Sequence, residues 1–491
     1  MATRQPRKQR YILLPPCGIA AESFIEVNAH VGLFMQSLRV QARFTLGTTN
    51  MRVIDSARDT GLKLVEMTPL GVAQMRRAAP GVRIVEEQFY EVARAPLPRP
   101  LSPVRTKSGQ PPAPATLHFT CNGRPVAGAE VHAYTNALLE IGVMGHTRAD
   151  GSVNLRTGAR ALIEKLVVMP RLGGWPLVLE NVQLPRTEPI ALRPIDLAVP
   201  DALQLAIANA PGGEGDGVRI GIIDTGCGPH PHLALAGGLC TVVGEPAADF
   251  ADNALQHGSH VAGIIGARGA SPQGMRGLAP QAQLFAYRVF PESGFASNYS
   301  IAKAIDQAVA DGCDLINMSL GSLAAADPAT SSAIADARSA GAVVFCAAGN
   351  DGINLVCQPA ADPRAVAVGA WGRKGSFPPD SLSATRLGRL SRTDRKHFMG
   401  SFSNWGSELE FAGPGVGIVS TVPGAAWAVM DGTSMATPAV TGMVARLLSA
   451  SPRVMSMPRD QARSDEILGL ALQAAKPLGF GPEYEGNGWI T

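Results

Sequence analysis

Residues 432–438 read Gly-Thr-Ser-Met-Ala-Thr-Pro, and a run of apolar residues at helical spacing follows them. This pattern predicts a tight turn that opens a buried helix, with the Ser434 side chain exposed at the turn and its backbone N–H free. The N-terminus of such a helix carries a partial positive charge, which would stabilise a negatively charged oxygen. Serine is also a common helix N-cap, so on the turn alone capping is the stronger interpretation.

Three stretches upstream change that interpretation. The first and last of them are nearly continuous apolar runs and predict central parallel strands, and the middle one predicts a helix of small residues. In chain order they are residues 218–226 (VRIGIIDTG), 257–263 (HGSHVAG) and 342–350 (AVVFCAAGN). Their polar residues are a carboxylate, an imidazole and an amide: Asp224, His257 and Asn350. Because open α/β sheets carry their sites at the carboxyl ends of their strands, we expect these groups to meet Ser434 at one sheet edge.

These residues resemble the subtilisin-like serine peptidases. The matching motifs stand in the family's order: Asp224-Thr-Gly, His257-Gly-Ser-His-Val-Ala-Gly, Ala348-Gly-Asn350 and Gly432-Thr-Ser434-Met-Ala-Thr-Pro438. The resemblance runs from about residue 218 to the C-terminus. It implies that Ser434 is the nucleophile, His257 its general base and then acid, and Asp224 the group that orients His257. It also implies that Asn350 and the Ser434 N–H stabilise the oxyanion.

The residue types suit this chemistry. A serine hydroxyl is a poor nucleophile at neutral pH unless a neighbouring base takes its proton, and the pKa of an imidazole lies near neutral pH. Taken singly, Asp224 would be a turn carboxylate and His257 a structural histidine. We interpret His260, three residues further on, as structural, packing or hydrogen-bonding within the first turn of its helix. A second resemblance to the family concerns Ser319, Leu320 and Gly321, which would pair by their backbone with an extended substrate.

Length and composition set wider limits. The 491 residues suggest two to four domains, and the net charge of +3 is too small to indicate a nucleic-acid partner. No apolar run reaches the ~18 residues of a membrane span, so we expect no membrane partner. The basic start is followed by a short apolar stretch broken by Pro15-Pro16, so we recognise no signal peptide and expect a cytoplasmic protein, with signal-independent export left open.

The seven cysteines are scattered, without a Cys-x-x-Cys pair, and suit buried free thiols. Bridges between Cys227 and Cys240 or between Cys346 and Cys357 remain possible. We predict no metal site: His230 and His232 in a proline-rich loop are weak evidence for one. We expect no cofactor, but calcium, which is common in the family, is left open because no calcium site can be read from this sequence.

Residues 1–95 predict a small α+β domain of ferredoxin type. We expect strands at residues 11–14, 61–67 and 82–92 and helices at residues 20–38 and 70–79. The stretch 80–87 (PGVRIVEE) resembles the inhibitory propeptide of the family, whose C-terminal tail occupies the active-site cleft like a substrate. An unrelated packing domain is the alternative.

Residues 96–115 are a proline-rich linker, and residues 116–195 predict a small β-sandwich of short strands. The pair Asp150-Gly151 indicates a β-hairpin, and the region resembles carboxypeptidase regulatory domains. Cleavage in the linker would leave this β domain on the mature enzyme, whereas cleavage within residues 196–217 would remove it. The sequence leaves both open.

Residues 196–491 predict the catalytic domain, a doubly wound, mostly parallel sheet with helices on both faces. The basic run 373–397 is interpreted as a solvated surface loop, with a docking site for an acidic partner as the alternative. By spacing, Cys357 or Gln358 would form the floor of the main specificity pocket, which predicts that bulky aromatic residues fit poorly there.

These observations predict a serine endopeptidase made as a self-inhibited precursor that processes itself. Its expected partners are a protein or peptide substrate and its own N-terminal domain. Two alternatives stay open: a catalytically silent binding scaffold, and a protease dedicated to one partner protein with the β domain as its docking module.

Overall fold

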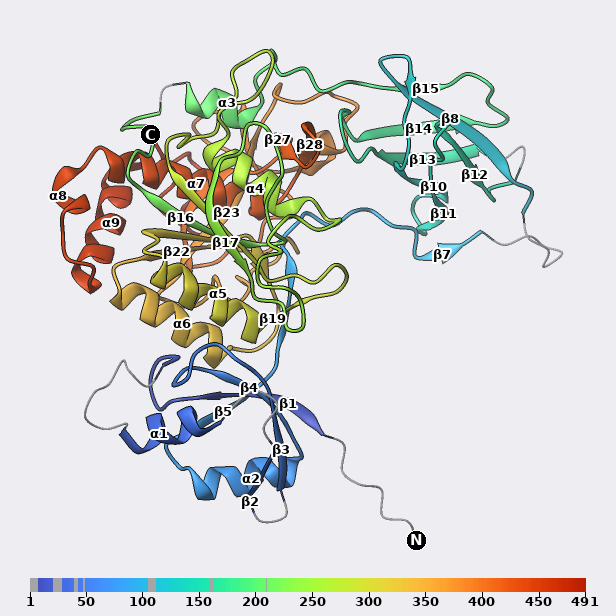
Figure 1. Ribbon diagram of the computed structural model, residues 1–491. Coiled ribbons are helices and arrows are strands. Elements are labelled where there is room, and N and C mark those ends of the chain that lie inside the picture. The colour runs from blue at the N-terminus through green and yellow to red at the C-terminus, as the bar shows by residue number, and fades with distance from the viewer. Residues whose placement is uncertain are drawn as a thin grey trace, which may run out of the picture.

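The computed structural model describes residues 8–20, 29–38, 43–46, 49–104, 112–158, 162–208 and 210–491. Figure 1 shows three folded units: a small N-terminal unit below helices α5 and α6, a β-sandwich to one side, and a large α/β body between them. An extended segment runs from the N-terminal unit past β19 to the sandwich. Among these residues, no helix is both long enough and apolar enough to cross a bilayer.

The large body is built on a mostly parallel sheet, as predicted. Its strand order is β17-β18-β16-β20-β22-β23-β25-β24, with β26 paired in parallel to β23. The antiparallel pairs of this sheet, β23 with β25 and β25 with β24, lie at one edge. The strands are β16 (Arg219–Asp224), β17 (Leu235–Cys240), β18 (Gln283–Arg288), β20 (Leu315–Met318), β22 (Val343–Ala347), β23 (Val366–Arg373), β24 (Leu387–Leu390), β25 (His397–Gly400) and β26 (Leu409–Pro414).

Helices cover both faces of this sheet. Alternate side chains of β16 show the two layers, because Ile220 and Ile222 pack in one core cluster and Ile223 in the other. The first cluster lies under α4 and α7, and the second under α5 and α6. The helices of the body are α3 (Ala202–Ile207), α4 (His257–Gly266), α5 (Asn298–Ala310), α6 (Pro328–Ser339), α7 (Thr433–Ser449), α8 (Pro452–Met455), α9 (Gln461–Ala474) and α10 (Pro482–Glu485).

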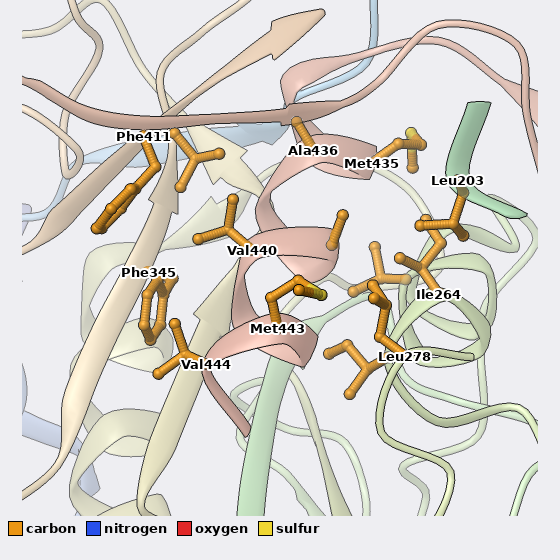
Figure 2. Close-up of a cluster of buried hydrophobic side chains, with 14 of the residues drawn as sticks. Leu203, Ile264, Leu278, Phe345, Phe411, Met435, Ala436, Val440, Met443 and Val444 are labelled. Carbon is orange, nitrogen blue, oxygen red and sulfur yellow. The ribbon is translucent and has the colours of Figure 1, made fainter. Parts of the chain in front are cut away.

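Helix α7 is buried along most of its length, which fixes the position of its first turn. Val440 and Val444 point toward Phe411 and Phe345 of the sheet, and Met443 points toward Leu278 (Figure 2). Both sides of the helix therefore contact core residues. Small strands complete the body: β19 (Ala296–Ser297), β21 (Leu320–Gly321), the hairpin β27 (Ile418–Val422) and β28 (Ala426–Met430), and the pair β29 (Ala475–Lys476) and β30 (Trp489–Ile490).

The N-terminal unit is an antiparallel sheet of order β2-β3-β4-β1-β5 with two helices on one face. Tyr11 and Leu13 face those helices, whereas Ile12 and Leu14 pack against the cluster under α5 and α6. The elements are β1 (Gln9–Leu14), α1 (Ala29–Ser37), β2 (Arg43–Leu46), β3 (Thr49–Ser56), β4 (Lys63–Met67), α2 (Pro69–Ala78) and β5 (Arg83–Glu86). Of the predicted helix 20–38, α1 covers Ala29–Ser37, Ala20 instead forms an isolated antiparallel bridge with Gly61, and residues 21–28 lie outside the described residues.

The prediction of one continuous strand over residues 82–92 is wrong. The run divides into β5 and β6 (Phe89–Val92), and β6 leaves the N-terminal sheet to pair with β19 and β21 of the body. Asn298, the first residue of α5, replaces the lost strand partner: its side chain accepts from the Gln88 N–H at 3.0 Å and donates to the Glu86 carbonyl at 3.3 Å. A side chain from elsewhere in the chain thus takes over the backbone hydrogen bonds at the polar stretch 86–88 (EEQ), where the strand breaks.

The β-sandwich has two sheets that share one core, of orders β14-β13-β10-β11-β7 and β12-β8-β15. The hairpin predicted at Asp150-Gly151 is wrong, because β11 and β12 lie in different sheets and β12 pairs with β8. Gly151, at φ +76°, turns the chain from one sheet to the other. The strands are β7 (Ser102–Pro103), β8 (Ala115–Cys121), β9 (Arg124–Pro125), β10 (Glu130–Asn136), β11 (Ile141–His146), β12 (Ser152–Leu155), β13 (Leu162–Met169), β14 (Leu177–Gln183) and β15 (Ile190–Leu192).

The basic run 373–397 is not a plain solvated loop. It carries β24 and the start of β25 at the sheet edge, and it docks the sandwich. Leu382 is buried against Tyr134, Val167 and Met169 of the sandwich. The Val178 N–H donates to the Asp380 carbonyl at 2.8 Å. The apolar residues inside the basic run therefore join two units, which its charge pattern did not indicate.

Candidate active site

The carboxylate of Asp224 and the imidazole of His257 form one buried pair. Asp224 ends β16 and His257 begins α4, and both side chains are fully buried. Asp224 Oδ1 lies 2.7 Å from His257 Nδ1. Burial lowers the pKa of His257, and the Arg94 guanidinium lowers it further, against the opposing effect of Asp224. The neutral ring donates its Nδ1–H to Asp224, and Nε2, which has no partner among the described residues, keeps its lone pair.

Ser434 stands in the first turn of α7, at the predicted place but not in the predicted environment. Its side chain is fully buried rather than exposed, because Ala93 covers it. The hydroxyl donates to the Ala93 carbonyl oxygen at 2.6 Å and lies 3.1 Å from the Ser319 carbonyl oxygen. The backbone N–H of Ser434 points at the same Ala93 oxygen, at 3.3 Å. No hydrogen bond joins Ser434 to His257. Hydrogen bonds of this kind are often long or poorly aligned until the reactive complex forms.

A proline in α7 leaves one carbonyl of the first turn without its helical hydrogen bond. Pro438 has no N–H, so the Ser434 carbonyl four residues earlier lacks its helical donor. The Ser319 hydroxyl fills that place and donates to the Ser434 carbonyl at 2.9 Å. Ser319 therefore positions the Ser434 turn as well as the strand beside it.

Asn350 presents a free amide group to this site. Its Oδ1 accepts from the Thr433 N–H at 2.8 Å and from the Thr433 hydroxyl at 3.1 Å. Its Nδ2 is buried without a partner among the described residues. Because Thr433 holds the oxygen side of the amide, the N–H side is left to donate to another oxygen in the site.

The segment before Ala93 lies in the cleft as an extended strand. In β6, Val92 pairs with Leu320 and Glu91 with Gly321, while Tyr90 pairs with Ala296 on the other side. The Ala93 N–H donates to the Ser319 carbonyl at 3.1 Å. The three residues predicted to pair with a substrate thus pair with the chain's own residues 91–93.

The large body is similar in sequence to known proteins. The model of the subtilase family (Peptidase_S8) matches residues 215–482. The chain belongs to the subtilase family. Over 250 residues it is 36% identical to the M-protease of Shouchella clausii, a match that covers 51% of this chain and 59% of that protein. It is also 36% identical to Subtilisin Savinase of Lederbergia lenta, of which the match covers 83%. A thermostable alkaline protease of Halalkalibacterium halodurans is 35% identical over 276 residues, 56% of this chain and 66% of the relative.

A cavity of about 620 Å³ opens beside Ala93 in this subtilase. Its lining includes Gly321, Asn350, Asp351 and Cys357, so the cysteine predicted for the specificity pocket does face the cleft. The Cys357 sulfur lies 3.5 Å from the Asn404 amide. Burial raises the pKa of Cys357 to about 12, so the group is a thiol rather than a thiolate.

Two charged groups near the site have no sequence motif. Asp252 lies in the loop before α4; its carboxylate accepts from the Thr225 hydroxyl at 2.6 Å and from the Ser259 N–H at 2.7 Å. Burial raises the pKa of Asp252 to about 6. Arg94 follows Ala93, donates to the Leu255 carbonyl and interacts with both Asp224 and Asp252. Only the fold brings these residues together, although Asp252 stands just five residues before His257.

The remaining candidates have structural surroundings. His260 Nε2 lies 3.1 Å from the Ile418 carbonyl and 3.2 Å from the Ala428 carbonyl, so its contacts are with β27 and β28 rather than within its own helical turn. All seven cysteines carry free thiols, so neither considered bridge forms. Among the residues that the structure describes, no group of three histidine, cysteine or acidic side chains is arranged to hold a metal ion.

Proposed function

We propose that this chain is a serine endopeptidase precursor that cleaves its own Ala93–Arg94 bond and is inhibited by the N-terminal product. One observation carries the proposal. The Ala93 carbonyl oxygen lies within hydrogen-bond distance of both the hydroxyl and the backbone N–H of Ser434, at 2.6 and 3.3 Å. A peptide carbonyl held at these two atoms is positioned for attack by the hydroxyl.

In the first step, the Ser434 oxygen bonds to the Ala93 carbonyl carbon while His257 Nε2 takes the hydroxyl proton. The charge that develops on the Ala93 oxygen is stabilised by the Ser434 N–H and by Asn350 Nδ2. Asp224 stabilises the imidazolium that forms and keeps the ring in the tautomer that offers Nε2. The lowered pKa of His257 supports this step, since the ring is neutral and ready to accept a proton at neutral pH.

The tetrahedral intermediate then releases the Arg94 amine, which takes the proton from His257. This leaves an ester between Ser434 and the Ala93 acyl group. A water molecule, deprotonated by His257, attacks the ester and frees Ala93 as a carboxylate and Ser434 as an alcohol. The same sequence of steps would apply to a protein or peptide substrate once β6 has left the cleft.

Contacts between the N-terminal unit and the body support inhibition after the cut. Lys303 of α5 forms an ion pair of 2.7 Å with Asp55, and the buried Tyr90 hydroxyl donates to Asp327 at 3.0 Å. Ile12 and Leu14 bury their side chains against the body. None of these contacts depends on the Ala93–Arg94 bond, so residues 8–93 would keep the cleft filled after it breaks.

Intact mass measurement after expression tests the proposal. Wild type is expected to give fragments 1–93 and 94–491, and Ser434→Ala to remain whole. Cutting within residues 196–217, or fragments in both proteins, would contradict the assignment. A chain that stays whole and does not react with a fluorophosphonate at Ser434 would instead indicate the silent scaffold.

Activity of the self-processed enzyme on denatured casein, measured after fragment 1–93 has been removed, separates a general protease from one dedicated to a single partner. The intact-mass experiment also needs a control variant away from the site. Glu188→Gln serves, since this residue is exposed on the sandwich, and the variant should process itself like wild type. Asn404→Asp would not serve, because Asn404 contacts Asp351 in the pocket.

A further inference from the structure

The segment that follows the proposed cut is held as firmly as the one before it. Residues 94–103, which we call the arm, lead from the end of β6 to β7 of the β-sandwich (Figure 1). Under the proposed cut they lie on the primed side, which receives the residues after the broken bond. The body holds its first part. The Ala95 N–H donates to the Asp431 carbonyl at 2.9 Å, and Arg386 donates to the Pro96 carbonyl at 2.6 Å. The Ala95 side chain is buried in the main core cluster.

The β-sandwich holds the second part of the arm. His132, a fully buried side chain of β10, hydrogen-bonds through Nδ1 to the Pro98 carbonyl. Its Nε2 lies 2.8 Å from Glu130, and Glu130 in turn forms an ion pair with Arg99 at 3.5 Å. Buried polar atoms are nearly always hydrogen-bonded, and without the arm His132 Nδ1 would lose the Pro98 carbonyl. This contact therefore favours the bound position of the arm.

The arm then joins the sandwich sheet. The Leu101 N–H donates to the Glu140 carbonyl at 2.9 Å, and β7 pairs in parallel with β11. Gly142 of β11 packs closely on both neighbours, because a Cβ there would meet the Ala133 carbonyl of β10 first and would lie 3.0 Å from Pro100 of the arm. Most of these contacts involve the backbone of the arm, so the surface suits an extended polypeptide more than one particular sequence.

We propose that the β-sandwich, together with Asp431 and Arg386, forms a primed-side binding site for an extended polypeptide, and that the arm stays in this site after the cut. This inference rests on the proposed function, because it takes the Ala93–Arg94 bond as the one that breaks. The arm remains tethered to the sandwich, so its effective concentration at the site is of millimolar order. A substrate with a long primed segment must displace the arm, whereas a substrate with only a small leaving group need not.

Two substrates test this with the self-processed enzyme after fragment 1–93 has been removed, so that the cleft before the cut bond is empty. Both carry the sequence of residues 89–93; one ends in a p-nitroanilide and the other continues with the sequence of residues 94–103. Weakening the arm in the variant Arg99→Gln/Leu101→Pro should lower KM for the long peptide at least threefold and leave KM for the p-nitroanilide unchanged. Arg124→Gln, an exposed site on β9, is the matched control and should change neither value.

Equal KM values for the long peptide in wild type and in the arm variant would overturn the proposal. Failure of the proposed function would look different, since the p-nitroanilide would then not be cleaved at all. Amide hydrogen exchange gives a second readout that needs no turnover. Ala95 and Leu101 should stay protected in the cut wild type as in uncut Ser434→Ala, and full exchange of both in the cut protein would equally overturn the proposal.

Discussion

Under the proposed mechanism, replacing Asn350 with alanine would remove one of the two donors to the developing negative charge. Thr433 holds the Asn350 oxygen at 2.8 and 3.1 Å, so the Nδ2 group is fixed, buried and unpartnered before the reaction begins. A donor held in this way needs no reorganisation when the Ala93 oxygen becomes an anion. We therefore expect the loss to appear in the chemical step rather than in binding.

The size of the effect follows from this arrangement. Two donors, the Ser434 N–H and Asn350 Nδ2, would share the oxyanion, and the loss of one such donor costs about 10²–10³ in rate, or ~2.7–4 kcal/mol in the transition state. Alanine also leaves the Thr433 N–H without its acceptor, which lowers the free energy of unfolding by ~1–3 kcal/mol, whereas the Thr433 hydroxyl keeps the Gly349 carbonyl at 3.4 Å. A variant is needed that separates these two effects.

Asn350→Asp provides that separation, because aspartate keeps an acceptor for Thr433 but offers no N–H to the oxyanion. The assay is the first-order rate at which the intact chain is converted to fragments 1–93 and 94–491. The bond is held within the same molecule, so this rate reports the chemical step without a binding term. Both variants should be slowed at least 100-fold. Self-cleavage of either at the wild-type rate would refute the oxyanion assignment.

Three further predictions concern the general base, the specificity pocket and the stability of the body. Because burial lowers the pKa of His257, the imidazole stays neutral to lower pH than usual. The self-cleavage rate should therefore be constant around pH 7 and fall with a midpoint below pH 6.5, and a midpoint at or above 6.5 in a pH–rate profile would contradict this. Ala93→Phe should slow self-cleavage because Cys357 limits the cavity beside Ala93, and adding Cys357→Gly should restore much of the rate, measured by the same fragment assay. Arg463→Ala should lower the free energy of unfolding by ~3–5 kcal/mol in urea, since its buried ion pair with Asp314 is 2.8 Å long. Arg459→Ala, which removes a half-exposed partner of the same carboxylate, should cost below ~1 kcal/mol, and equal losses would rule out burial as the cause.

The parts of the fold that could be predicted are those that local pattern determines. Buried parallel strands such as β16 and β22 are continuous apolar runs, and small residues mark the starts of α4 and α7. The groups at their ends, Asp224, His257, Asn350 and Ser434, could be named because each stands in a short motif. Their convergence at one edge follows from the parallel order of the strands.

The parts that could not be predicted depend on partners distant in sequence. Nothing in the alternation of residues 82–92 indicates that Asn298 takes over the backbone at Gln88, so the division into β5 and β6 was missed. The burial of Ser434 beneath Ala93 depends on that same division. Asp252 acquires its environment only from Thr225 and Ser259, and Leu382 acquires its role from the sandwich that docks on it.

Only two residues, Glu87 and Gln88, separate the last strand of the N-terminal sheet from β6. That sheet is docked on α5 and α6, so the two-residue connection fixes how far along the chain β6 extends. The position of the docked unit therefore determines which peptide bond lies at Ser434. Deleting Gln88 would bring Arg94 to the place of Ala93, and every side chain of the inserted strand would change faces. Under the proposed cut, the bond is thus chosen by its distance along the chain from an anchored domain, and a poor residue at that distance would still be presented to the nucleophile.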